Sequence, residues 1–401
     1  MKHSPPSFDA FAITAPGLEM ITARELHALG AGEAQAIEGG VSFPASPQLL
    51  YSANLRLRTA SRVIVRASAF EATAFHELER RAKRIRWDEL IAPNLPVSVR
   101  VTCRKSKLYH SDAVAQRVAG AIEATVKGVR VVDDAGDEGD GDAQLILVRL
   151  LHDRCTISVD SSGTLLHRRG YRQAVAKAPM RETLAAAMLL GSGWDGSVPL
   201  VDPMCGSGTI AIEGAMIARR IAPGLERRFA FERWPAFGAT IWKEIVAAAR
   251  AEVLPKSPVV IQASDRDAGA IEAARSNAER AGVLPDIELA VKPISAISPP
   301  ETPGLVATNP PYGVRVGESD RVRNLHAQFG KVMSAKCPGW SVSMLSADSK
   351  LERQTGLSFE PILQTSNGGI RVRVVARDFW EHRPQTLHPA YLGFVTAIKT
   401  V

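Results

Sequence analysis

Apolar and polar positions follow two different patterns along the chain, and the change falls near residue 165. Before it, helical and strand patterns follow one another without a phosphate-type glycine turn. Apolar residues recur at helical spacing in some segments and at every second position in others, which predicts a mixed α and β region. The expected helices cover 21–29, 75–90 and 112–126, and the expected strands cover 61–69, 96–103, 145–151 and 155–159.

After residue 165, strands and helices alternate in the order typical of a doubly wound parallel sheet. The expected strands cover 198–201, 259–263, 287–291, 305–308 and 340–345, the expected helices 210–221, 268–281 and 322–335, and a closing antiparallel pair 359–364 and 370–376. An insertion at 223–254 carries Trp234, Phe237 and Trp242, and we expect it to pack as extra helices over one edge. The second half is therefore predicted to be an α/β domain.

Composition narrows the class of protein but not its activity. The 401 residues are 45% hydrophobic and 23% charged, which is ordinary for a soluble globular protein. No apolar stretch is long enough to cross a bilayer, and the N-terminus lacks the apolar core of a signal peptide. The acid- and glycine-rich stretch 133–142 lacks the ligand spacing of a calcium loop and is expected to be solvated. A net charge of +7 and a pI near 9.3 permit a polyanionic partner without requiring one.

The four cysteines are scattered without a paired spacing. They are Cys103, Cys155, Cys205 and Cys337. This arrangement argues against a zinc site and against a disulfide framework, so we expect a reducing, cytoplasmic location.

A glycine-rich turn, Asp202-Pro203-Met204-Cys205-Gly206-Ser207-Gly208-Thr209, follows the first strand of the second half. Its two glycines allow the backbone to approach a ligand closely. Asp265 ends the next strand, where a carboxylate can hold both ribose hydroxyls, although it could instead cap the helix after it. No Gly-Lys-Ser/Thr follows, and the third glycine of a dinucleotide fingerprint is missing. The remaining candidate is S-adenosylmethionine, which has a ribose and an amino-acid carboxylate but no phosphates.

The tetrapeptide Asn309-Pro310-Pro311-Tyr312 directly follows the apolar run 304–308. An exocyclic base amine is a poor nucleophile because its lone pair is delocalised into the ring. The Asn309 amide oxygen and the Pro310 carbonyl can accept the two amine hydrogens, which localises the lone pair toward a methyl donor. Tyr312 offers a flat face for a base that has left its helix, although a packing role is also open. The expected catalytic residues are Asn309, Pro310, Pro311 and Tyr312.

Several stretches resemble one known family. Residues 202–209 and 309–315 resemble class I methyltransferases that modify guanine at its exocyclic amine. Residues 167–172 and 178–186, which read His-Arg-Arg-Gly-Tyr-Arg and Ala-Pro-Met-Arg-Glu-Thr-Leu-Ala-Ala, are similar to the segment before the catalytic sheet in bacterial THUMP-domain RNA methyltransferases. Residues 104–115 resemble the helix-opening segment of the THUMP module. The resemblance spans about residues 11 to 379.

This resemblance implies a domain order and a reaction. It implies an N-terminal ferredoxin-like domain at 8–60, a THUMP RNA-binding domain at 61–162, and a Rossmann-like, seven-stranded class I methyltransferase domain at 163–401. The implied reaction transfers a methyl group from S-adenosylmethionine to guanine N2 in structured RNA. Large-subunit ribosomal RNA is favoured over transfer RNA, and no membrane or metal partner is expected.

The resemblance also assigns site residues, because in this family the Pro-x-Arg-Glu segment forms part of the methionine-side pocket. The expected cofactor-binding residues are Pro179, Arg181, Glu182, Thr183, Asp202, Gly206, Ser207, Gly208, Thr209, Asp265, Arg266 and Asn309. The expected RNA-binding residues are Arg104, Lys105, Lys107, Tyr109, His110, Arg168, Arg169 and Arg172. For the last three, phosphate contact or linker docking competes with a solvated turn, and for His110 a capping or packing role is favoured over a catalytic one.

Two positions depart from the family pattern. The third strand ends in Val291-Lys292, where an acidic residue usually contacts the adenine amine. The closing hairpin reads Ser366-Asn367-Gly368, where a tyrosine usually precedes Asn-Gly. Three other functions stay open: methylation of transfer RNA, methylation of a protein glutamine, whose planar amide also suits Asn-Pro-Pro-Tyr, and a non-catalytic role as an RNA-binding assembly factor.

Overall fold

The computed structural model describes residues 7–133, 136, 142–173, 180–312 and 319–377. It consists of two compact units, each made of two stretches of chain. Met1–Arg172 and Arg220–Leu254 form the first unit, and Gln173–Arg219 and Pro255–Val401 form the second. The chain therefore passes between the units three times. The insertion belongs to the first unit, whereas the expected domain limits assign it to the second.

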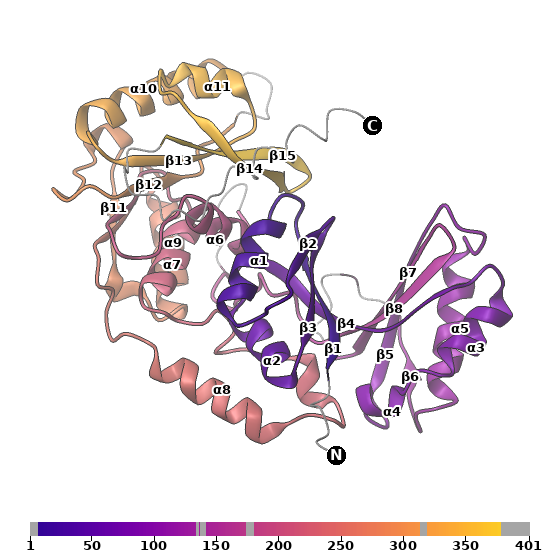
Figure 1. Ribbon diagram of the computed structural model, residues 1–401. Helices are drawn as coiled ribbons and strands as arrows, with labels where there is room; N and C mark the ends of the chain where they lie inside the picture. Colours follow the sequence, from indigo (N-terminus) through magenta and orange to yellow (C-terminus); the bar gives the residue numbers. More distant parts are fainter. Residues whose placement is uncertain (1–6, 134–135, 137–141, 174–179, 313–318, 378–401) are drawn as a thin grey trace. The chain divides into compact units, whose positions relative to one another are not determined.

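The first unit is built on one eight-stranded sheet (Figure 1). In chain order its strands are β1 (Phe8–Thr14), β2 (Gln35–Ile37), β3 (Gly40–Ala45), β4 (Ala60–Glu71), β5 (Pro96–Arg104), β6 (Arg130–Val131), β7 (Gln144–Leu151) and β8 (Arg154–Asp160). They lie in the order β2, β3, β1, β4, β8, β7, β5, β6. The long strand β4 pairs with β1 on one side and with β8 on the other. Because one strand serves both neighbours, the ferredoxin-like and THUMP regions share a continuous sheet and one apolar core.

Five helices precede the insertion in the first unit. They are α1 (Glu19–Ala28), α2 (Pro47–Arg56), α3 (Phe75–Ala82), α4 (Trp87–Leu90) and α5 (Ser111–Glu123). Helices α3 and α5 lie together beside the strands β5 and β7 (Figure 1). The expected helix 75–90 is broken after Ala82. The fully buried Trp87 donates its ring N–H to the Ala82 carbonyl at 2.9 Å, which turns the chain at this point.

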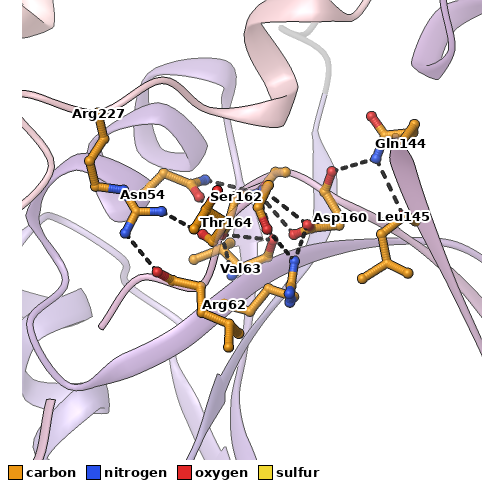
Figure 2. A network of polar contacts seen from close by, with 12 residues as sticks. Asn54, Arg62, Val63, Gln144, Leu145, Asp160, Ser162, Thr164 and Arg227 are labelled. Carbon is orange, nitrogen blue, oxygen red and sulfur yellow. Dashed lines mark hydrogen bonds and ion pairs between the residues drawn. The ribbon is translucent and has the colours of Figure 1, made fainter. Parts of the chain in front are cut away.

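A buried polar network lies where β4 meets β8 (Figure 2). Arg62 forms an ion pair with Asp160, and both side chains are almost completely buried. The Asp160 carboxylate also accepts the backbone N–H groups of Ser162 and Gly163, each at 2.9 Å. Burial raises the pKa of Asp160, and the Arg62 charge opposes that rise. Each oxygen of the buried carboxylate therefore has a partner, which a buried ion pair requires if it is not to destabilise the fold.

The insertion completes the core of the first unit. It contains the single turn η2 (Ala230–Arg233) and the helix α8 (Ala239–Ala251). Tyr51 of α2 stacks on Phe231 with 4.4 Å between ring centroids, and Trp242 meets Phe231 edge-on at 5.2 Å. The Trp234 ring N–H donates to Gln144 Oε1 at 2.9 Å. These rings bury large apolar areas, so the insertion is an integral part of this unit's core.

The second unit is built on a seven-stranded sheet. Its strands are β9 (Leu200–Asp202), β10 (Ile261–Asp265), β11 (Ile287–Val291), β12 (Leu305–Thr308), β13 (Ser341–Ser346), β14 (Glu360–Asn367) and β15 (Ile370–Arg377). They lie in the order β11, β10, β9, β12, β13, β15, β14, and only β15 runs antiparallel to its neighbours. This arrangement confirms the predicted Rossmann-like sheet with a closing antiparallel pair.

Helices and single turns connect these strands. They are α6 (Glu182–Gly191), α7 (Thr209–Ala218), α9 (Ala268–Arg280), η3 (Leu284–Asp286), η4 (Ile294–Ala296), α10 (Ser319–Lys336) and α11 (Ser349–Gln354). The strand order reverses between β9 and β12, which are direct neighbours. Ligands bind outside the carboxyl ends of the strands at such a switch point. The glycine-rich turn follows β9 and the Asn-Pro-Pro-Tyr turn follows β12, so both motifs start at this point.

Candidate active site

The glycine-rich turn connects β9 to α7 and depends on its glycines. Gly206 and Gly208 have φ angles of 52° and 83°, in the left-handed region that favours glycine. A Cβ on Gly208 would lie 2.9 Å from the Cβ of Ala274 in α9. Helix α9 can therefore approach the turn this closely only at a glycine. The turn brings backbone N–H groups to the start of α7, where a ligand carboxylate is favoured.

Asp265 ends β10 and is bound directly to this turn. One carboxylate oxygen accepts the Gly206 N–H at 3.0 Å, and the other accepts the Asp267 N–H at 3.0 Å. Asp267, not Asp265, caps α9, because its side chain accepts the Gly269 N–H at 2.8 Å. The capping alternative for Asp265 is therefore wrong. Each Asp265 oxygen keeps a lone pair for a further donor such as a ribose hydroxyl.

Asp202 joins the two motifs. Its side chain is buried and accepts the Thr308 hydroxyl hydrogen at 2.9 Å and the Met204 N–H at 3.2 Å. Burial raises the pKa of Asp202 to about 7, the two hydrogen bonds oppose this rise, and the nearby Asp265 adds to it. The ends of β9 and β12 are therefore joined by a carboxyl group whose charge changes near neutral pH.

The Asn309 to Tyr312 turn places one unsatisfied acceptor beside the cofactor turn. Asn309 Oδ1 is buried, and within residues 180–312 and 319–377 no hydrogen-bond donor to it is present. Pro310 is buried and Pro311 is exposed. The half-buried Tyr312 hydroxyl accepts a hydrogen bond from Asn367 Nδ2 at 3.3 Å. Burial raises the pKa of Tyr312, and hydrogen bonds from the Asn367 and Asn309 side chains oppose that rise.

The remaining expected cofactor residues lie mostly at the start of α6. Pro179 is outside the described residues. Arg181 is the exposed residue that precedes α6, whereas Glu182 and Thr183 in its first turn are buried. Helix α6 packs against α7, which begins at the glycine turn. Arg266 is exposed beside Asp265, so it is free of the core and open to a ligand.

The expected RNA-binding loop between β5 and α5 is exposed and braced. Lys105, Lys107 and His110 are exposed, and Tyr109 exposes 68% of its surface. The rings of Tyr109 and His110 lie 4.1 Å apart between centroids. The Lys107 N–H donates to Asp153 Oδ1 at 2.6 Å, which ties the loop to the turn between β7 and β8. Cationic groups and a flat ring are thus presented on a fixed loop.

The strand register adds two arginines that the sequence analysis missed. Leu151 of β7 pairs with Arg104 of β5 and with Arg154 of β8, and Arg149 lies two positions earlier on β7. Side chains two positions apart share a face, so Arg104, Arg149 and Arg154 lie on one face of the sheet. All three are exposed, whereas the intervening Leu150 is buried in the core. The alternation of Arg149, Leu150 and Leu151 was the available signal.

Arg169 is a correction to the expected RNA-binding set. Its side chain is buried and donates to the carbonyls of Leu166 at 2.7 Å and Arg58 at 2.6 Å. Its guanidinium therefore holds the first unit together and does not face a phosphate. Arg168 is exposed, and Arg172 is half-buried.

Other features do not compete with this site. Among the described residues, no group of three or more His, Cys, Asp or Glu is placed to hold a metal ion, and no helix is long and apolar enough to span a membrane. The four cysteines are free thiols. Burial raises the pKa of Cys205 well above its usual value, which suits a small packing residue rather than a nucleophile. A cavity of about 770 Å³ lined by Phe359 and Arg377 lies at the amino ends of the parallel strands, away from Asn309.

Three family models match successive parts of the chain. The RlmL ferredoxin-like domain matches residues 9–64, the THUMP domain matches 72–160, and the RMKL-like methyltransferase domain matches 169–370, about half of the chain. This chain belongs to the RMKL-like methyltransferase family. The matches confirm the THUMP-containing methyltransferase family and the class I fold that the sequence predicts.

The methyltransferase is similar to other proteins over almost its whole length. A protein of Synechocystis sp. (strain ATCC 27184 / PCC 6803 / Kazusa) described as "Putative RNA methyltransferase slr0064" is 34% identical over 361 residues, which are 90% of this chain and 94% of that protein. The structure of SMU.472, described as a methyltransferase complexed with SAH, is 28% identical with a TM-score of 0.83, covering 94% of this chain and 100% of that one. A Listeria monocytogenes protein described as "a predicted N6-adenine-specific DNA methylase" is 31% identical with a TM-score of 0.80, covering 92% and 96%.

The residues of the site fit S-adenosylmethionine, the cofactor of this methyltransferase. Asp265 retains acceptor capacity for ribose hydroxyls, and the turn around Gly206 and Gly208 leaves room where a side chain would clash. No lysine of a phosphate-binding loop follows the turn. When bound, the cofactor supplies an electrophilic methyl group on a positively charged sulfur, which the acidic pair Asp202 and Asp265 suits.

Proposed function

We propose that this methyltransferase transfers a methyl group from S-adenosylmethionine to the exocyclic N2 amine of a guanosine in large-subunit ribosomal RNA, in the cytoplasm. It is a THUMP-containing, S-adenosylmethionine-dependent RNA methyltransferase. The amine, the base and the kind of RNA are the proposal.

One observation carries the choice of an amine as the acceptor. Asn309 Oδ1 is buried, and no hydrogen-bond donor reaches it from any residue of the second unit that the structure describes. A buried acceptor without a donor is costly, and a substrate N–H removes that cost. The atom belongs to the turn after β12, next to the cofactor turn after β9, so a donor bound there lies beside the methyl group's site.

The residues of the turn perform three tasks in this reaction. Asn309 Oδ1 accepts one amine hydrogen and the Pro310 carbonyl accepts the other, so that the lone pair is held out of the ring plane. Tyr312 offers its ring to the flipped base. The amine proton passes to water after transfer, so no residue is assigned as a strong base.

The first unit supports RNA as the substrate. The exposed arginines of the β5–β7–β8 face and the cationic loop at Lys105 and Lys107 can neutralise phosphates. A protein glutamine methyltransferase was expected to carry a helical N-terminal domain, and the eight-stranded sheet disfavours that alternative. The unpartnered Asn309 acceptor and the intact glycine turn favour an enzyme over a non-catalytic assembly factor.

The choice of guanine N2 and of ribosomal RNA rests on the sequence resemblance of 202–209 and 309–315. An adenine N6 amine also has two hydrogens that would suit Asn309, and the Listeria relative's description names that base in DNA. Transfer RNA is the alternative among RNA substrates.

Mass spectrometry of nucleosides from a deletion strain tests the assignment. We expect N2-methylguanosine to fall in large-subunit ribosomal RNA and to return with the wild-type gene but not with an Asn309→Ala gene. Loss of N2-methylguanosine from transfer RNA alone would overturn the choice of RNA. Loss of N6-methyladenine from DNA, with ribosomal RNA unchanged, would overturn both the base and the nucleic acid.

A further inference from the structure

The side chain of Asn367 reaches the catalytic turn from a different part of the second unit. Asn367 is the last residue of β14 and pairs with Ile370 of β15 across the two-residue turn Gly368-Gly369. Both glycines have positive φ angles, 57° and 81°, as a tight hairpin turn requires. Asn367 is 8% exposed, so the hairpin holds its side chain in a fixed, buried position.

From there, Asn367 Nδ2 donates to the Tyr312 hydroxyl at 3.3 Å. The Asn309 side chain also hydrogen-bonds this hydroxyl. That bond lowers the pKa of Tyr312, and an amide lowers a phenol pKa by donating its N–H to the oxygen. The Asn309 amide nitrogen therefore faces Tyr312.

The orientation of the amide decides what Asn309 presents to a substrate. A carboxamide has an acceptor oxygen and a donor nitrogen of nearly the same size, and only its hydrogen bonds fix which way it faces. With Nδ2 on the Tyr312 hydroxyl, Oδ1 is turned away, and it is the buried atom that has no partner among the described residues. The reverse orientation would present an NH₂ group to an amine, donor against donor, and would abolish the acceptor.

We infer that Asn367 is a positioning residue for methyl transfer: it fixes the Tyr312 hydroxyl, and through it holds the Asn309 amide with its oxygen toward the substrate amine. The inference rests on the proposed function for its rate measurement only. Asn367 lies outside the expected site residues, and its departure from the family is only in the serine before it.

A titration tests the contact without any substrate. Asn367→Leu removes the donor, so the pKa of Tyr312 should rise, seen as a later phenolate absorbance step that is missing in Tyr312→Phe. Asn367→Asp keeps the shape, lacks the N–H donor and adds a negative charge, so it should raise the pKa further and serves if Asn367→Leu does not fold. An unchanged Tyr312 titration in a folded variant would overturn the contact.

A double-mutant cycle tests the role. Single-turnover methyl transfer to ribosomal RNA from the deletion strain should fall about three- to tenfold in Asn367→Leu and in Tyr312→Phe. The double variant should fall no further than either single variant, because both break one relay. Affinity for S-adenosylhomocysteine should stay constant, and Asn367→Gln, which keeps a donor, should recover part of the rate.

The outcomes separate this inference from the proposed function. Losses that multiply in the double variant would mean that Asn367 supports the fold only, and would overturn the positioning role. Counting total methyl groups transferred makes the cycle independent of the product. A product other than N2-methylguanosine would therefore overturn the proposed base while the cycle still decides on Asn367.

Discussion

Thr308 donates its hydroxyl hydrogen to Asp202 across 2.9 Å, and this bond joins the last residue of β12 to the last residue of β9. The two strands pair through Leu305 and Val306, and the side-chain bond extends their contact to the carboxyl ends where the motifs begin. The amine-orienting turn and the cofactor turn are therefore held together by one buried carboxyl group.

Stability should depend on pH through Asp202. Its pKa in the folded protein is about 7, above the ordinary value of 3.8, so its contribution is complete below pH 4 and is lost as pH rises to 7. Between those values the unfolding free energy of the wild type should fall by on the order of 4 kcal/mol relative to Asp202→Asn. Urea denaturation at several pH values measures this. Parallel curves for the two proteins would contradict it.

Asp265→Ala should weaken cofactor binding. The change removes charge-assisted hydrogen bonds of about 1.5–3 kcal/mol to the ribose, so affinity for S-adenosylhomocysteine should fall roughly tenfold or more in calorimetry. Asp267→Ala is the matched control, because it removes only the cap of α9 and should cost about 1 kcal/mol of stability. Equal losses of affinity in both variants would show that α9, not the Asp265 carboxylate, is responsible.

Asn309→Ala should reduce turnover by roughly 10²–10³ while the affinities for cofactor and RNA change little, because its acceptor acts in the transition state. Single-turnover transfer of a labelled methyl group to ribosomal RNA measures the loss. A near-normal rate would move the catalytic centre elsewhere.

Tyr312→Ala should be more damaging than Tyr312→Phe. The alanine variant loses base stacking worth about 1–3 kcal/mol as well as the hydroxyl, whereas the phenylalanine variant keeps the ring. The same methyl-transfer measurement orders the two variants. The reverse order would mean that the ring packs in the protein and does not stack on a base.

Arg149→Ser and Arg154→Ser should each weaken RNA binding and reduce the slope of log affinity against log salt by about 0.7–0.9, the effect of one phosphate contact. Arg353→Ser is the control, since that residue is also exposed but lies on α11 of the second unit. Filter binding at several salt concentrations measures the slopes. An equal slope change in the control would remove the assignment of the sheet face.

Strong periodicity made much of the second unit predictable. The strands at Ile287–Val291 and Leu305–Thr308 lie where the sequence predicts them, because each is a short apolar run between clear turns. In the first unit, β1, β2, β3 and α2 were missed. Helix α2 begins at Ser46 and Pro47, a good capping pair, but its low amphipathicity hides it among its neighbours.

The site was only partly predictable for a different reason. Asp265 and Asn309 stand in local motifs, so sequence spacing identifies them. Asn367 reaches Tyr312 from a hairpin 55 residues later, and Arg169 turns inward onto Arg58 from 111 residues away. Contacts between distant segments have no local signal, so a lone arginine in a basic run could not be distinguished from a surface residue.

The position of the insertion in the chain affects how the protein is made. Phe231 and Trp234 belong to the core around Tyr51, yet β9 and α7 of the other unit are synthesised before them. At roughly 5–20 residues per second, a ribosome adds the 182 residues from Gln173 to Leu254 and beyond only after the first sheet is complete, and that sheet must wait seconds with its aromatic pocket open. A nascent chain paused between these points exposes apolar surface, so the order of synthesis gives chaperones a defined window on this protein.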